Sequence, residues 1–524
     1  MDLNFKFLKE DFSSSLVVFL VALPLCLGVG QASTDVEGIN GIPISGLLAG
    51  IIGGVLVGLI SKSRIGVSGP AAGLITIIIA ALLTLKSYEG FLVAIIFAGI
   101  LQVIAGYLKL GVLANYFPSS VIKGMLAAIG ITLILKEIPH AVGYDKDFFG
   151  DESFFQMDGE NTFSELFQAL GALHPGAVIL SLFSILVLIL FDKPFLKKIK
   201  LFKILPGALF VVLIGIGLNL VFPLLSPQLE ITGKHLVQIP VATSFESFTS
   251  MLYFPDFSFL SNPQVYIIGA TIALVASLET LLSVEATDKL DPEKHHTPKN
   301  LELKAQGIGN IASGLIGGLP ITQVIVRSSA NVNSGAKTKL SAIIHGLWLA
   351  VAILIIPSVL NLIPLSALAA ILILVGYKLA KVELFKSQWN LGFEQFIPFI
   401  STILGVLFTD LLKGIAIGMV ISIFYILRKN YRNNYQMNET KVDDGNEMEI
   451  VLSEEVSFLN KGSILETLTS VPEGTHLTID GSKCREIDFD VLEVIQEFKD
   501  FGAPEKKIKL TTINIPQVAI SGGH

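Results

Sequence analysis

The sequence predicts a polytopic α-helical membrane protein with a small soluble α/β domain at its carboxyl end. Hydrophobic residues make up 52% of the 524 residues and charged residues only 15%, and the mean hydropathy is +0.69. Soluble globular domains carry about 25% charged residues. Apolar runs of about 17–25 residues, the length that crosses a hydrocarbon core, recur up to residue 432. Beyond that residue the long apolar runs stop.

Fourteen apolar segments are expected, in two sets of seven. The first set is 13–33, 44–60, 70–86, 89–107, 118–137, 172–191 and 204–222. The second set is 263–285, 303–318, 320–334, 338–357, 365–380, 394–410 and 412–428. A transmembrane transport domain is therefore expected over residues 1–432, and a short cytoplasmic α/β domain over residues 433–524.

The basic residues fall on one side of the membrane when the fourteen segments are threaded through it. They are Lys6, Lys9, Lys62, Arg64, Lys193, Lys197, Lys198, Lys200, Lys203, Lys337, Lys339, Lys378, Lys381, Arg428, Lys429 and Arg432. An excess of Lys and Arg marks the cytoplasmic side, so both termini are expected there. Because seven is odd, the second set enters from the opposite side, and the two sets form an inverted repeat.

Two short stretches show the same arrangement at matching places in the two sets. Ser68-Gly69-Pro70 begins the third segment, and Gly318-Leu319-Pro320 begins the tenth. Pro is tolerated in the first turn of a helix, and Gly lets the preceding backbone run extended. A helix that starts inside the bilayer points its positive end at the protein interior. Interrupted segments at matching places indicate a transporter's binding site, and two such N-termini favour an anion.

The residues around the two prolines are the expected anion ligands. Backbone N–H groups would make most of the contacts, with the Thr322 hydroxyl and the Gln323 amide as side-chain donors. Ser68 is expected to cap its helix rather than to touch the anion, and Gln31 is a weaker candidate ligand. The full expected set is Gly69, Ala71, Ala72, Gly73, Ile321, Thr322, Gln323 and Arg327.

Arg327 lies about two turns after Pro320, inside an apolar segment. A charge at such a place is costly, so it is a functional hypothesis by default. The expected role is to supply positive potential beside the anion. The alternatives are an ion pair with a buried carboxylate, or a side chain that reaches the cytoplasmic face.

Glu279 in the eighth segment is the candidate for coupling to a cation. Ser283 follows one helical turn later on the same face and would add an oxygen ligand. A buried carboxylate can carry a proton or bind Na⁺, so both ions are candidates and no other metal or cofactor is expected. The alternative is a Glu279–Arg327 pair that only holds two helices together.

The tail alternates between strand-like and helix-like runs. Strands are expected at Met448–Leu452, His476–Ile479 and Lys507–Thr512, and a helix is expected from Phe489 to about Gly502. This alternation in a short segment predicts a small α/β domain.

Together these segments resemble the SulP family of sulfate-permease-like anion transporters. The resemblance lies in the Gly69-Pro70 segment, in Ala305-Gln306-Gly307-Ile308-Gly309-Asn310 before Gly317-Gly318-Leu319-Pro320, and in Thr409-Asp410-Leu411-Leu412-Lys413-Gly414. It implies a 7+7 inverted repeat of uracil-permease-like architecture. Segments 1–4 and 8–11 would form a core domain, and segments 5–7 and 12–14 a gate domain, with substrate between the starts of segments three and ten. It also implies a homodimer, an elevator-like movement, an Arg beside the anion and an acidic coupling residue at position 279.

The tail resembles a STAS domain at Asp480-Gly481-Ser482 and Ile487-Asp488-Phe489-Asp490. Regulatory bacterial STAS proteins have a phosphorylatable Ser at this junction, whereas this chain has Asp488, Phe489 and Asp490. Phosphorylation switching is therefore not expected there. A short domain of this kind would instead serve dimer contacts.

The sequence thus favours a secondary active transporter of a small inorganic oxyanion, sulfate or bicarbonate, in the inner membrane of a bacterium. Two alternatives are a nucleobase permease of the same fold and an uncoupled anion channel or exchanger. Arg327 argues against a nucleobase site, which needs a carboxylate and an amide to read ring N–H groups, and Glu279 argues for coupled transport. No HExxH, GxSxG or Walker-type sequence is present, which argues against an enzyme. No nucleic-acid partner is expected.

Overall fold

The computed structural model describes residues 5–518 apart from 37, 40, 150–153, 155–158, 192, 194–205, 242–245, 247–248, 433–434 and 443–444. The basic residues Lys197, Lys198, Lys200 and Lys203 lie outside the described residues. The chain divides into two compact units, Met1–Met419 and Val420–His524. Each unit is treated by itself below.

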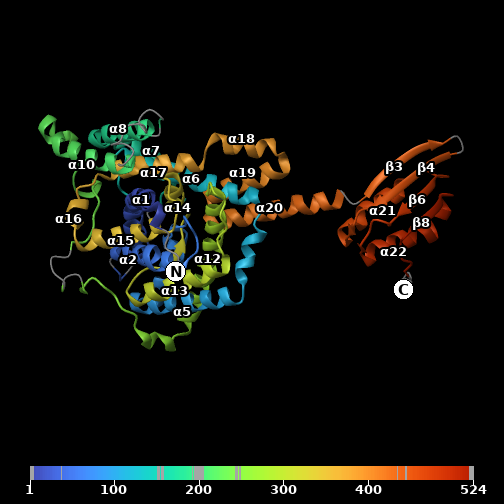
Figure 1. Ribbon diagram of the computed structural model, residues 1–524, viewed down its shortest axis with the longest axis horizontal. Helices are drawn as coiled ribbons and strands as arrows, with labels where there is room; N and C mark the ends of the chain where they lie inside the picture. The colour runs from blue at the N-terminus through green and yellow to red at the C-terminus, as the bar shows by residue number, and fades with distance from the viewer. Residues whose placement is uncertain are drawn as a thin grey trace. The chain divides into compact units, whose positions relative to one another are not determined.

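Each of the fourteen expected segments has a helical counterpart in the described residues (Figure 1). The first seven are α1 (Leu8–Thr34), α2 (Pro43–Ile52) continued by η2 and α3 to Ile60, η3 (Ala72–Leu74) with α4 (Ile75–Leu85), α5 (Tyr88–Tyr107), α6 (Ser119–Ala141), α8 (Pro175–Phe191) and α10 (Gly207–Leu225). The second seven are α12 (Pro263–Leu290), α13 (Lys299–Leu315), α14 (Ile325–Asn333), α15 (Leu340–Leu354), α17 (Leu365–Leu379), α19 (Phe393–Phe408) and α20 (Leu411–Arg432). The predicted polytopic fold is therefore confirmed.

Some helices have full membrane-spanning length and others are shorter. By length and apolarity, seven helices of the described chain can each cross a bilayer, or eight if the bent pair α7 (Thr162–Gly171) and α8 counts as one span. The stretch that holds η3 and α4 is among the shorter apolar helices, and α14 has only 9 residues. These are the two helices predicted to begin inside the membrane, so their shortness follows from where they start.

Reciprocal glycine contacts hold several pairs of helices close together. A Cβ added at Gly99 of α5 would lie 2.5 Å from the carbonyl oxygen of Gly307 in α13, and one added at Gly307 would lie 2.6 Å from that of Gly99. Gly130 of α6 and Gly376 of α17 face each other in the same way, at 2.5 and 2.6 Å. Small residues at such crossings let helix backbones approach closely in a membrane.

The third glycine pair relates the two sets of segments. Gly54 in η2 faces Gly346 in α15, where added Cβ atoms would lie 2.7 and 3.0 Å from the opposite Cα. This pair joins segments two and eleven, and the Gly99–Gly307 pair joins segments four and nine. An inverted repeat exchanges these two pairs of segments, so the same crossing occurs once in each orientation.

The tail is a four-stranded sheet with helices packed against it (Figure 1). The strands are β3 (Tyr435–Val442), β4 (Gly445–Leu452), β6 (His476–Asp480) and β8 (Lys509–Ile513), in the order β3-β4-β6-β8. Within this sheet the β3–β4 pair is antiparallel, and the β4–β6 and β6–β8 pairs are parallel. Apolar residues of β4, β6, α21 (Lys461–Ser470) and α22 (Phe489–Glu497) form one core.

Three of these strands and α22 lie where the sequence predicted them, whereas β3 and α21 were missed. Asp488 forms the N-cap of α22, because its Oδ1 accepts a hydrogen bond of 3.0 Å from the Asp490 N–H. A capping role explains a carboxylate at this junction without any phosphorylation chemistry. The tail is therefore a small α/β unit, as predicted, and its identity as a STAS domain stays a prediction.

The Gly99–Gly307 crossing can be tested by substitution. Gly99→Val should destabilise the membrane unit by roughly 1–3 kcal/mol or prevent folding, because overpacked side chains force helices apart. Gly217→Val in α10 is the control, since an added Cβ there meets no atom within 4 Å. The measurement is the yield of monodisperse protein in detergent and its thermal unfolding midpoint. Equal behaviour of the two variants would contradict this account of the crossing.

Candidate functional site

The two interrupted segments meet as a pair of short antiparallel strands. Strand β1 (Ser68–Pro70) pairs with β2 (Ile321–Gln323) in the register Ser68↔Gln323, Gly69↔Thr322 and Pro70↔Ile321. The helices begin only afterwards, at Ala72 and at Ile325. The sequence placed the second helix start directly after Pro320, which was wrong by one turn. The extended backbone that proline imposes continues as a paired strand before the chain turns helical.

This shift changes which backbone donors are available. The Ile321 N–H donates to Oδ1 of Asn310 at 2.6 Å, and the Gln323 N–H donates to Oγ1 of Thr280 at 3.3 Å. These two expected anion donors are therefore used within the protein. The first turn of α14 instead offers the N–H groups of Ile325, Val326 and Arg327, which have no acceptor within the helix.

The start of η3, which follows β1, matches the sequence expectation more closely than the start of α14 does. Ala71 is extended at the N-cap of η3, and Ala72 and Gly73 form its first turn. No side chain caps this helix start, so the expected capping role of Ser68 was wrong. The Ser68 hydroxyl instead accepts a hydrogen bond of 2.7 Å from Nε2 of Gln306. The N–H groups at the helix start are thus left without a side-chain cap.

Arg327 is buried at this crossing, with 1% of its surface exposed. Its Nη2 donates to the carbonyl oxygen of Pro70 at 3.1 Å, whereas Nε and Nη1 have no hydrogen-bond partner in the described part of the chain. A Cβ at Gly69 would overlap Nη1, so only glycine leaves room for the guanidinium. The side chain thus turns back from α14 toward β1 and does not reach the cytoplasmic face. A buried cation with two free donors is complementary to an anion.

Two further polar groups of β2 are buried beside it. The Thr322 hydroxyl is fully buried, and no described residue forms a hydrogen bond with it. Gln323 donates from Nε2 to Oγ1 of Thr287 at 3.2 Å, and its Oε1 has no partner. The hydroxyl of Thr322 is therefore free to donate, whereas the amide of Gln323 is anchored to α12.

Glu279 and Ser283 come to the site from α12. Both are buried, with 6% and 5% of their surface exposed. A Cβ added at Gly73 would lie 3.0 Å from Oε1 of Glu279, so the carboxylate lies directly over the start of the first half-helix. Because Nε and Nη1 of Arg327 have no hydrogen-bond partner, neither atom is bonded to this carboxylate. The structure thus brings the predicted cation residues and anion residues to one crossing.

Sequence reasoning missed the residues that hold the crossing in place. Thr280 and Asn310 accept the β2 N–H groups described above, and both are fully buried. Asn310 had been quoted only for the family resemblance. The four-residue spacing of Gln306 and Asn310, which puts two amides on one helical face, was the available signal.

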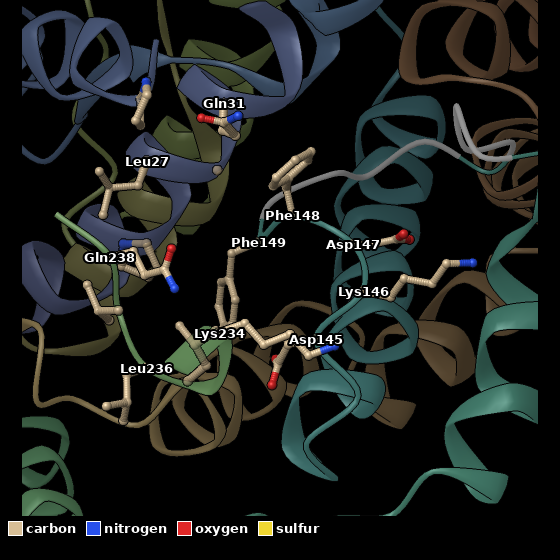
Figure 2. Close-up of a pocket in the computed structure, with 15 residues that line it drawn as sticks. Leu27, Gln31, Asp145, Lys146, Asp147, Phe148, Phe149, Lys234, Leu236 and Gln238 are labelled. Carbon is tan, nitrogen blue, oxygen red and sulfur yellow. The ribbon is translucent and has the colours of Figure 1, made fainter. Parts of the chain in front are cut away.

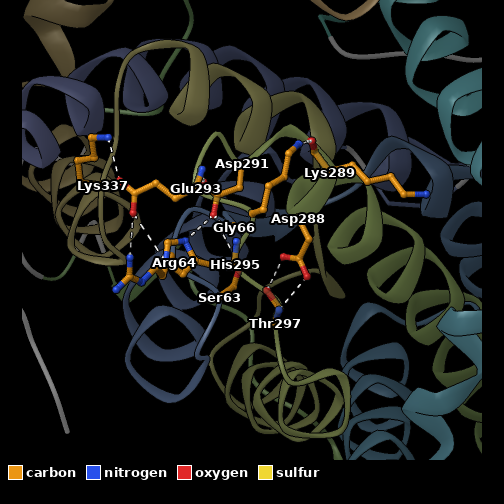
Figure 3. A network of polar contacts seen from close by, with 11 residues as sticks. Ser63, Arg64, Gly66, Asp288, Lys289, Asp291, Glu293, His295, Thr297 and Lys337 are labelled. Atoms are coloured by element: carbon orange, nitrogen blue, oxygen red, sulfur yellow. Dashed lines mark hydrogen bonds and ion pairs between the residues drawn. The ribbon is translucent and has the colours of Figure 1, made fainter.

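The loops that carry Arg64, Glu293 and Lys337 in the same unit are joined by a polar network (Figure 3). Glu293 accepts from Arg64 at 3.3 Å and from Lys337 at 3.1 Å, and so connects three loops. Asp288 accepts from the Thr297 N–H and hydroxyl at 2.8 and 2.7 Å. The two ion pairs of Glu293 join solvent-exposed side chains, and such pairs contribute about 0–1 kcal/mol each.

Gln31 lines a cavity of about 340 Å³ between α1 and the segments 145–149 and 234–238, and none of the other candidate ligands lines it (Figure 2). Asp145 at this cavity accepts from Nδ1 of His140 and Nδ1 of His235, each at 2.6 Å. Burial opposes ionisation of Asp145, but the two hydrogen bonds prevail and hold its pKa below the usual value. The structure therefore does not place Gln31 with the other candidate ligands.

Comparison with known proteins agrees with the resemblance to sulfate-permease-like transporters. The profile of the sulfate permease family matches residues 8–402. The putative sulfate transporter YvdB of Bacillus subtilis is 27% identical over 81% of this chain and 75% of its own length. The bicarbonate transporter BicA of Picosynechococcus sp. is 27% identical over 88% of this chain and 77% of its own.

Two solved structures share the fold. The transmembrane domain of a cyanobacterial bicarbonate transporter BicA aligns with 80% of this chain and 98% of its own, at 22% identity and a TM-score of 0.53. The murine Solute Carrier 26 family member A9 anion transporter, solved in the inward-facing state, aligns with 98% of this chain and 87% of its own, at 15% identity and a TM-score of 0.66. The chain is therefore a multi-pass membrane protein of the sulfate permease family, a family of transporters and not of enzymes.

Proposed function

We propose that this chain is a secondary active transporter of a small inorganic oxyanion, sulfate or bicarbonate. The anion would bind at the crossing of β1 and β2, between the starts of η3 and α14 and beside Arg327. The single observation that carries this assignment is the buried guanidinium, whose Nε and Nη1 have no hydrogen-bond partner among the described residues. The names of the relatives support the two candidate substrates.

The energetics favour an anion as the missing partner. An Arg at the centre of a membrane helix costs about 2.5–3.5 kcal/mol, and a buried donor without an acceptor adds about 1–3 kcal/mol. An oxyanion accepts several charge-assisted hydrogen bonds at once and removes both penalties. The dipole ends of two helices add to the same field. A neutral ring such as a nucleobase would leave the charge uncompensated.

We assign the coupling cation, Na⁺ or H⁺, to Glu279 with Ser283. Support comes from the position of the carboxylate over Gly73, at the start of the half-helix that would hold the anion. A cation at this position neutralises the carboxylate, which would otherwise repel the anion. Each ion then favours binding of the other, which is the thermodynamic requirement for symport.

The larger movements follow from the family resemblance. Core and gate domains would move past each other in an elevator-like step, in a homodimer with both termini in the cytoplasm of a bacterium. The basic residues that the described chain places on the α12–α13 and α14–α15 loops support that orientation.

The role of Arg327 predicts a graded series of variants. Arg327→Ala should weaken anion affinity about 10- to 150-fold, the equivalent of one charge-assisted hydrogen bond of about 1.5–3 kcal/mol. Arg327→Lys should recover part of the loss, because Lys keeps the charge and loses the planar fork. Gly69→Ala should also weaken binding, because the added methyl group displaces the guanidinium from its position although the positive charge is retained. Equilibrium binding of labelled anion to purified protein measures all three.

The competing structural reading makes a different prediction for the same site. If Arg327 only neutralises Glu279, the double variant Arg327→Ala with Glu279→Ala should regain the uptake that each single variant loses. Gradient-coupled uptake in the double variant would contradict both assignments. The proposed function predicts no uptake.

Glu279→Gln tests the coupling site. The amide keeps the shape of the side chain but cannot carry a proton or balance Na⁺, so gradient-driven uptake should stop while anion binding changes less. Uptake of labelled sulfate and bicarbonate into proteoliposomes, under imposed Na⁺ and H⁺ gradients in turn, measures this and identifies the substrate and the ion. An unchanged dependence on both gradients in the variant would overturn the coupling role.

A further inference from the structure

One face of α13 is bonded to both strands of the crossing. Gln306, Asn310 and Ser313 are spaced by four and three residues, so they lie on one side of the helix, and all three are fully buried. Gln306 donates to Ser68 of β1 at 2.7 Å, as described above. Ser313 donates from its hydroxyl to the carbonyl oxygen of Leu319 at 2.7 Å, just before β2.

Asn310 makes the most extensive of these contacts. Its Oδ1 accepts from the Ile321 N–H at 2.6 Å, and its Nδ2 donates to the Ile321 carbonyl oxygen at 3.0 Å. An amide side chain can satisfy both backbone groups of one residue in this way, as a neighbouring strand would. The backbone of Ile321 is thus held at two points, at the residue that pairs with Pro70.

The same amide is connected to the helix that carries Glu279. Nδ2 of Asn310 also donates to Oε1 of Gln102 at 2.7 Å, and Nε2 of Gln102 donates to the Ser277 hydroxyl at 3.3 Å. Ser277 lies two residues before Glu279 on α12. A continuous chain of hydrogen bonds therefore runs from β2 to α12.

From this arrangement we propose that Asn310 is a positioning residue of the anion site. It does not touch the anion. It fixes β2 against β1, and thereby fixes the direction in which α14 begins and the place of Arg327, while Gln306 holds β1 in the same way. This inference rests on the proposed function for the identity of the ligand, but not for the positioning itself.

The strands themselves are too short to set this geometry. Each has three residues, whereas strands in proteins usually have about 5–6, and an isolated pair is only marginally stable. Small errors matter here, because a misplacement of about 1 Å in a positioned group can cost about 100-fold in rate. External hydrogen bonds from a rigid helix supply the missing constraint.

The chain contains two matched controls for Asn310. Asn219 holds the backbone of Ile231 with two hydrogen bonds of 2.9 Å each. Asn361 holds Ile239 in the same way, at 2.6 and 3.0 Å. Both bind one isoleucine through its N–H and carbonyl oxygen, as Asn310 does. Among the described residues, their side chains make no hydrogen bond to β1, β2 or the helices that follow these strands.

The test compares Asn310→Asp with Asn219→Asp and Asn361→Asp in the full chain. Asp keeps the acceptor Oδ1 and replaces the Nδ2 donor with an oxygen that repels the isoleucine carbonyl. Asn310→Asp should raise the KM for anion uptake at least tenfold, with little change in the controls. Hydrogen–deuterium exchange of the segment 319–328 should increase in Asn310→Asp alone. An unchanged KM together with unchanged exchange would overturn the inference, as would an equal rise in KM in a control.

A second variant and the exchange measurement test the proposal if Asn310→Asp does not fold or no anion is bound. If Asn310→Asp does not fold, Ser68→Ala removes the bond from Gln306 to β1 and should raise the KM severalfold with a normal unfolding midpoint; no rise would overturn the proposal. If the wild-type protein binds neither sulfate nor bicarbonate, the proposed function fails. The exchange measurement then still decides whether Asn310 positions β2.

Discussion

The antiparallel pairing of β1 with β2 is the contact on which the rest of the site depends. It joins two segments that are more than two hundred and fifty residues apart, Ser68–Pro70 and Ile321–Gln323. Pro70 ends β1 and Pro320 directly precedes β2, and neither has a backbone donor, so the chain stays extended and the helices start late, inside the membrane unit. The two helix N-termini are consequently left without side-chain caps, in a protein interior where uncapped donors are costly.

Glycine makes this crossing sterically feasible. Gly69 leaves the space that Nη1 of Arg327 occupies, and Gly73 lies directly under the carboxylate of Glu279. Charges of opposite sign are thus brought to one crossing. We propose that the anion and the coupling cation are held there together, each favoured by the field of the other. Reciprocal glycine contacts likewise let the backbones of the helices around the site approach each other closely.

The sequence predicted the segments far better than the contacts between them. Apolar length and the spacing of Gly and Pro locate all fourteen segments, because the hydrocarbon core sets their length. The same signals cannot show that Ile321 and Gln323 donate to Asn310 and Thr280, since those partners come from other helices. For that reason the helix start at Pro320 and the capping role of Ser68 were wrong. Strand β3 was missed because its mostly polar sequence shows no sustained alternation of apolar and polar residues.

The most direct test of the central claim is a structure of the protein with the anion that proteoliposomes accumulate. Selenate can replace sulfate, because its selenium atom is located by anomalous scattering. The account predicts the anion within hydrogen-bonding distance, about 2.7–3.1 Å, of the Arg327 guanidinium and of N–H groups in the first turns of η3 and α14. An anion located elsewhere, such as in the cavity beside Gln31 and Lys234, with the crossing unoccupied, would contradict it.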